Sequence, residues 1–109
     1  MAYENKYIQV DGLKTRYIED GAGPAAILLH GASLGSSADV FERNLKPLAS
    51  AGVRAIAYDQ PGFGLTDNPT DYSVAYRRRF IMMFMDALGL QNAAMVGHSQ
   101  AGSMAVANA

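Results

Sequence analysis

The stretch AAMVGHSQAG, residues 93–102, decides the fold. It begins with an apolar run that predicts a buried strand, and a helical pattern begins near Gln100. Between the two, Ser99 has a small residue two positions before it, Gly97, and another two positions after it, Ala101. A sharp turn from strand to helix requires small residues there, because its backbone passes close to its neighbours. The stretch therefore predicts a nucleophile elbow that holds the Ser99 hydroxyl above the sheet, beside the N–H groups of a helix N-terminus.

Upstream of this stretch, strand patterns and helix patterns alternate. Residues 7–10 and 15–18 alternate apolar and polar side chains around Asp11-Gly12, a dipeptide that favours a two-residue hairpin turn. Continuous apolar runs predict buried strands at residues 25–29, 53–58 and 93–96. Helical spacing predicts helices at residues 38–50 and 73–88, and a third from about residue 100. Asp71 or Ser73 can cap the second helix, and Gly89 suits its end.

This order of elements predicts an α/β fold. A β-hairpin followed by alternating strands and helices implies a mainly parallel sheet with helices on both faces. Residues 101–109 still follow an apolar helical pattern where the chain ends. We therefore expect residues 1–109 to form a single partial domain whose remaining part lies elsewhere, in the same or a separate chain.

Composition narrows the classes of function. Half of the 109 residues are apolar and the net charge is −1, which is typical of a globular protein without a nucleic-acid partner. The chain has no cysteine, which excludes disulfides and a cysteine nucleophile. We expect no metal and no cofactor, because the two histidines are dispersed and the glycine loops lack a phosphate-binding spacing. Without a secretory signal or an apolar run of about 20 residues, the expected location is cytoplasmic, away from membranes.

Two further motifs follow the other buried strands directly. The sequence HGASLG, residues 30–35, comes after the first of them, and DQPGFGLT, residues 59–66, comes after the second. Pro61, Gly62 and Gly64 suit a rigid turn with unusual backbone angles. All three motifs thus stand at the carboxyl ends of predicted strands, where open α/β sheets bind their ligands.

Taken together, the three motifs resemble those of the α/β-hydrolase family, and the resemblance covers essentially the whole chain. The family's usual elbow is Gly-x-Ser-x-Gly; this chain has Ala101 at its last position and keeps a glycine at Gly102. The resemblance implies that Ser99 is the nucleophile and that the backbone N–H groups of Ala32 and Gln100 form the oxyanion hole. It assigns structural roles to the following residues: His30, Gly31, Asp59, Gly62, Gly64, Gly97 and His98. The triad acid and histidine follow the serine in family order, so both should lie beyond Ala109, and this chain alone should be inactive.

The implied activity is hydrolysis of a small-molecule ester or similar carbonyl compound through an acyl-enzyme on Ser99. Hydrolases that cleave a carbon–carbon bond in dienoate ketones are an alternative, although they often have Asn where this chain has His98. A non-catalytic, ligand-binding member of the fold is another. Haloalkane dehalogenases and epoxide hydrolases use an aspartate nucleophile, so Ser99 disfavours both.

Plainer interpretations accompany each candidate residue. Ser99 could be an ordinary helix N-cap. His98 or His30 could be read as the base and Asp59 as the triad acid, although the resemblance gives all three structural roles. The run of arginines at residues 77–79 could bind an anion, but such a run early in a helix usually forms a solvated face.

Overall fold

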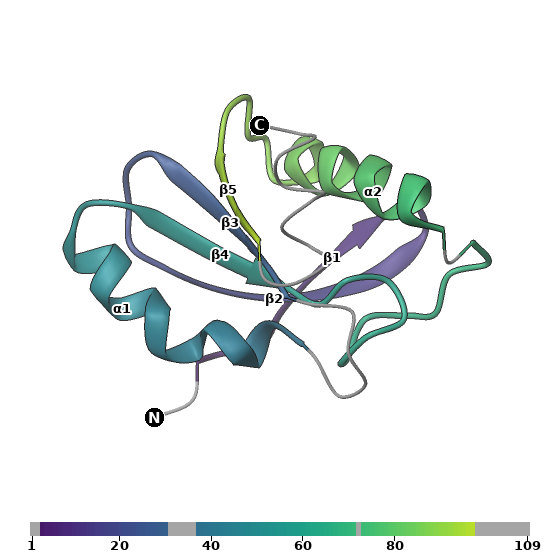
Figure 1. The fold of residues 1–109 in the computed structure, drawn as a ribbon, viewed down its shortest axis with the longest axis horizontal. Helices are drawn as coiled ribbons and strands as arrows, with labels where there is room; N and C mark the ends of the chain where they lie inside the picture. Colours follow the sequence, from purple (N-terminus) through teal and green to yellow (C-terminus); the bar gives the residue numbers. More distant parts are fainter. Residues whose placement is uncertain (1–2, 31–36, 72, 98–109) are drawn as a thin grey trace.

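One sheet of five strands organises the part of the chain that the structure, a computed structural model, describes: residues 3–30, 37–71 and 73–97. In chain order the elements are β1 (Lys6–Val10), β2 (Leu13–Asp20), β3 (Ala25–Leu29), the 3₁₀-helix η1 (Ala38–Phe41), α1 (Glu42–Ser50), β4 (Arg54–Tyr58), α2 (Val74–Ala87) and β5 (Ala94–Gly97). The strands lie in the order β1-β2-β4-β3-β5 (Figure 1). This is the predicted α/β architecture. The third helix expected from about residue 100 lies outside the described residues.

The N-terminal hairpin forms where the Asp-Gly step predicted it. Asp11 and Gly12 both have positive φ, 51° and 77°, and the strands pair from Lys6↔Tyr17 to Val10↔Leu13. A two-residue turn of this hand matches the natural twist of the strands that it joins. Strand β2 then pairs antiparallel with β4, while β3 pairs parallel with both β4 and β5. The predicted N-terminal hairpin and parallel strands are therefore confirmed, within a described sheet that is mixed, with two antiparallel and two parallel pairings.

Each of the two central strands buries both of its faces. In β3, Ile27 and Leu29 pack in one apolar cluster with α2, and Leu28 packs in a second cluster with η1 and α1. In β4, Ile56 and Tyr58 belong to the first cluster, while the intervening Ala57 belongs to the second. Successive side chains of a strand point to opposite faces, so the helices must cover both sides. Figure 1 shows α1 and α2 on opposite sides of the sheet.

Local signals set the ends of the second helix. The Ser73 side chain accepts a hydrogen bond from the N–H of Tyr76 and so caps the start of α2. Gly89, just past the end, has a φ of 73°, the left-handed conformation that commonly ends a helix. Both were predicted, Ser73 as one of two possible caps.

The first helix differs from its prediction at its start. Residues 38–41 form a 3₁₀ turn instead of α-helix, and the Ser37 side chain caps that turn by accepting a hydrogen bond from Asp39. The N–H of Ala38 is bound by a side chain from another segment, Asp59. The hydrogen bond to Asp59 thus constrains the first turn from outside the helix. Short 3₁₀ turns are common at the ends of α-helices.

We expect Phe84→Ala to cost about 3–5 kcal/mol of unfolding free energy. Phe84 is fully buried and its ring stacks on that of Tyr58, with centroids 4.4 Å apart, so the truncation leaves a cavity beneath the end of β4. Chemical unfolding of the protein measures the loss. Met82→Ala is the matched control on the same helix, because Met82 is 53% exposed and its truncation should change stability by no more than about 0.5 kcal/mol. Equal effects of the two changes would contradict this account of the core.

Candidate active site

The sheet register brings the starting points of the three motifs together. Leu29, the last residue of β3, pairs with Tyr58 at the end of β4 and with Gly97 at the end of β5. The next residues along the chain are His30, Asp59 and His98. The three motifs therefore begin beside one another at the carboxyl ends of neighbouring strands, as the sequence predicted. Ligand sites in open α/β sheets lie at such strand ends.

The structure describes half of the predicted site residues. These are His30, Asp59, Gly62, Gly64 and, at the end of β5, Gly97. The other half lie outside the described residues: Gly31, Ala32, His98, Ser99 and Gln100. The geometry of the site is therefore described from the strand ends and from the loop after β4.

His30 is fully buried and is bound to the loop that follows β4. Its Nε2 accepts a hydrogen bond of 2.9 Å from the N–H of Gln60, and its carbonyl oxygen accepts one of 2.6 Å from Nε2 of the Gln60 side chain. Its ring also packs against the ring of Phe63 in a T-shaped arrangement, with centroids 5.1 Å apart. An imidazole nitrogen that accepts a hydrogen bond carries no proton. The Nε2 of His30 is therefore engaged inside the protein, in a position that ties one loop to the other.

Asp59 is fully buried, and both of its carboxylate oxygens accept hydrogen bonds. Oδ1 receives Nη1 of Arg16 at 3.0 Å and the N–H of Ala38 at 2.7 Å. Oδ2 receives the N–H of Leu65 at 2.8 Å. Charged groups without water require such partners, since a buried charge is otherwise very costly. This one carboxylate connects β2, the segment before α1 and its own loop.

Arg16 is a site residue that the sequence did not reveal. It lies on β2, is 5% exposed, and binds Asp59 and, at 2.7 Å, Asp39. Burial alone would lower the pKa of Arg16, but the hydrogen bonds and negative charges of Asp39 and Asp59 outweigh it and raise the pKa. Its neighbour in the network, Thr66, accepts a hydrogen bond from the Arg16 N–H and donates one to the carbonyl of Asp59. The loop after β4 is thus bound to β2 as well as to β3.

The two glycines of the loop after β4 adopt the unusual backbone angles that the sequence predicted. Gly62 has a φ of 83° and Gly64 a φ of 52°. A Cβ atom at Gly64 would also overlap the carboxylate of Asp59. Glycine is needed at that position for two reasons, the left-handed conformation and the close approach of Asp59.

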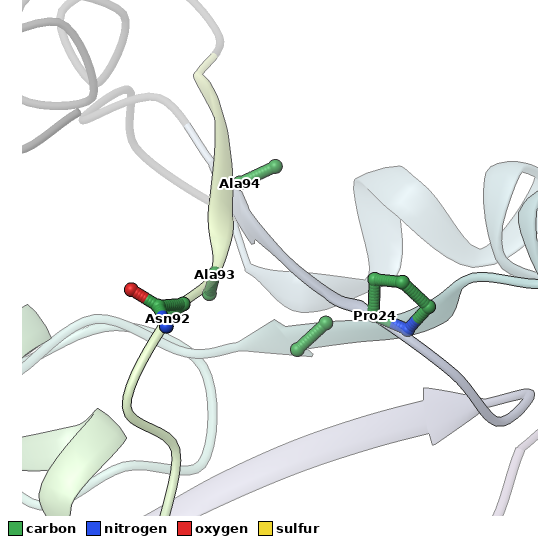
Figure 2. A pocket seen from close by; sticks show the side chains of 5 residues that line it. Pro24, Asn92, Ala93 and Ala94 are labelled. Atoms are coloured by element: carbon green, nitrogen blue, oxygen red, sulfur yellow. The ribbon is translucent and has the colours of Figure 1, made fainter.

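Other kinds of site find little support in the part of the chain that is described. Among residues 3–30, 37–71 and 73–97, no group of three or more histidine, aspartate or glutamate side chains could hold a metal ion. No described helix is long and apolar enough to span a membrane. A shallow depression lined by Pro24, Ala25 and residues 92–94 lies at the amino ends of β3 and β5, away from the three loops (Figure 2). Because the three motifs follow the opposite ends of these strands, the depression does not belong to the candidate site.

The chain belongs to the α/β-hydrolase fold family, whose model matches residues 24–109. Its relatives include hydrolases of meta-cleavage products and epoxide hydrolases.

Three similar proteins illustrate the range of activities named among the relatives. A 2-hydroxy-6-oxo-6-(2'-aminophenyl)hexa-2,4-dienoic acid hydrolase from Metapseudomonas resinovorans is 34% identical over 104 residues, covering 94% of this chain and 36% of that protein. An epoxide hydrolase from Caballeronia sordidicola is 34% identical over 94 residues, covering 84% and 28%. The crystal structure of a meta-cleavage product hydrolase from Pseudomonas fluorescens IP01 superposes with a TM-score of 0.84 at 37% identity, covering 94% and 39%. The chain thus spans about a third of the length of the relatives that it matches.

We expect Arg16→Met to destabilise the protein by about 3–5 kcal/mol, because it leaves the carboxylate of Asp59 buried without its countercharge. Urea unfolding measures the loss, with Arg43→Met on the exposed side of α1 as the control. Adding Asp59→Asn to Arg16→Met should recover part of the loss by removing the uncompensated charge. A double variant that loses the sum of the two single losses would show that Arg16 and Asp59 act independently.

Proposed function

We propose that this chain carries the nucleophile and the oxyanion hole of a serine hydrolase that attacks a carbonyl carbon. The observation that supports this most is the register that ends β3, β4 and β5 side by side. It places the departure points of the loop with Ala32 and of the elbow with Ser99 on neighbouring strands. Backbone donors from these two loops can then converge on one oxygen atom, which is the arrangement an oxyanion hole requires.

The proposed mechanism passes through an acyl-enzyme. A histidine accepts the proton of the Ser99 hydroxyl as its oxygen attacks the carbonyl carbon, and the N–H groups of Ala32 and Gln100 stabilise the resulting oxyanion. The histidine then gives its proton to the leaving group, and water attacks the acyl-enzyme to release the acid and restore Ser99. His30, Asp59 and His98 have structural roles in this scheme. The contacts of His30 and Asp59 support those roles, since both side chains are engaged in holding loops together.

The histidine and the acid of this scheme would lie beyond Ala109. The family order of the triad is serine, acid, histidine, and Ser99 lies ten residues before the end of the chain. The relatives are about three times as long as the matched region. The active protein is then one in which this chain is joined by the remaining C-terminal part of the fold, in the same or a separate chain.

For the substrate, we favour a dienoate ketone whose carbon–carbon bond is hydrolysed. Several relatives at 34–37% identity are named as hydrolases of such dienoates. The solved structure of a meta-cleavage product hydrolase also superposes with a TM-score of 0.84. An ester is the second candidate, because the same acyl-enzyme chemistry serves it and because His98 stands where dienoate hydrolases often have Asn. An epoxide is disfavoured despite the related epoxide hydrolases, since Ser99 replaces the aspartate nucleophile that those enzymes use.

A fluorophosphonate probe tests the nucleophile. In the intact protein, an activated Ser99 should displace fluoride and gain the mass of the phosphonyl group, which intact-mass spectrometry detects. Ser99→Ala should abolish the labelling, whereas Ser50→Ala at the exposed end of α1 should leave it unchanged. Labelling that persists in Ser99→Ala, or an intact protein that hydrolyses carbonyl substrates without being labelled, would contradict the proposal.

Turnover of three substrates tests the reaction class. We expect the intact protein to hydrolyse a 2-hydroxy-6-oxo-hexa-2,4-dienoate faster than a p-nitrophenyl ester and to leave a styrene-type epoxide unchanged. Activity on the ester alone would favour the second candidate. Ser99-independent turnover of the epoxide would overturn the serine mechanism, and binding of the ligands without turnover would indicate a non-catalytic member of the fold.

A further inference from the structure

Two consecutive residues after β4 bind the chain on either side of the segment 31–36. Gln60 binds His30, the residue before that segment, through two hydrogen bonds. Asp59 binds the N–H of Ala38, the second residue after it. The proposed oxyanion donor Ala32 lies within this segment. The residues on both sides of the segment 31–36 are therefore bound by the single dipeptide Asp59-Gln60.

The Gln60 side chain acts on one particular peptide bond. Its Nε2 donates to the carbonyl oxygen of His30 at 2.6 Å, and that oxygen belongs to the peptide group that joins His30 to Gly31. A peptide group is planar, so holding its oxygen restrains the orientation of the whole group. The bond from Gln60 consequently restrains the peptide group from which the segment 31–36 departs.

The cost of burying Gln60 indicates that the amide is kept for this bond. Gln60 is 1% exposed, and its Oε1 has no hydrogen-bond partner among the described residues. A buried acceptor left without a partner destabilises the folded state. A methionine would fill similar space without that penalty. Stability alone therefore does not explain a glutamine here, whereas a need for the donor at Nε2 does.

We propose that Gln60 is a positioning residue for the oxyanion hole. It acts through the His30–Gly31 peptide group and does not touch the substrate. The inference rests on the proposed function, because it assumes that Ala32 supplies an oxyanion donor. It goes beyond that function by assigning the orientation of the donor loop to a side chain of the neighbouring loop.

The test compares Gln60→Met with the wild type in the intact protein. The variant keeps the backbone hydrogen bond from residue 60 to His30 and loses only the side-chain donor. We expect kcat to fall about 10- to 100-fold with KM changed less than threefold, because a misplaced donor weakens the transition state more than the ground state. Affinity for a trifluoromethyl ketone, which forms an oxyanion on Ser99, should fall by a similar factor. Affinity for the matching methyl ketone, used as a ground-state ligand, should stay the same.

Gln9→Met is the matched control, since Gln9 is an exposed glutamine on β1. It should leave both affinities and kcat unchanged. Equal affinities of wild type and Gln60→Met for the trifluoromethyl ketone would overturn the inference. So would loss of folding, or equal losses for both ketones, since either outcome would mean that Gln60 serves only the structure.

The two proposals fail in different ways. If the wild-type protein neither reacts with the fluorophosphonate nor distinguishes the two ketones, the proposed function fails and takes this inference with it. If Ser99 is labelled and the wild type prefers the trifluoromethyl ketone, but Gln60→Met keeps that preference, only the role of Gln60 is wrong.

Discussion

A carboxylate removed from water must find its hydrogen-bond donors within the protein, and Asp59 finds them on three segments that are far apart in the sequence. Arg16 comes from β2, Ala38 precedes α1, and Leu65 belongs to the loop after β4. Because each donor must approach to about 3 Å, the three segments are fixed relative to one another. The candidate site is built on this requirement. The motifs of the site follow strands whose carboxyl ends are fixed by the hydrogen bonds of the buried Asp59 carboxylate.

The remaining contacts of the site extend the same constraint. Thr66 joins the loop after β4 to β2, and Gln60 joins it to the end of β3. Gly64 leaves the space that the carboxylate of Asp59 occupies. The loop after β4 thus supports the neighbouring segments through Asp59, Gln60, Gly64 and Thr66.

Sequence reasoning succeeded where the signal was local. The Asp11-Gly12 turn, the Ser73 cap and the Gly89 end depend on a few adjacent residues and could be predicted from them. The buried strands β3 and β4 were evident because both of their faces pack against helices. The prediction of a buried strand at residues 93–96 was wrong in the described structure, where β5 lies at the edge of the sheet and Val96 is 44% exposed. Arg16 was missed because a polar residue within an alternating strand is ordinarily exposed, and its burial depends on Asp39 and Asp59, 23 and 43 residues further along the chain. The role of Gln60 depends in the same way on His30, which is 30 residues away. The 3₁₀ start of the first helix has a similar cause, since its tether to Asp59 is not visible in residues 38–50.

The tethering of His30 and Ala38 to one dipeptide has a consequence for protein engineering. These hydrogen bonds bind His30 and Ala38, which lie outside the segment 31–36, so they do not depend on the side chains of that segment. Substitutions at residues 33–36 would then leave the hydrogen bonds that hold the end of β3 and the first turn before α1 in place. A library built on those four positions should therefore keep Gly31 and the proposed oxyanion donor Ala32, and should hold the anchors His30, Ala38, Asp59 and Gln60 constant.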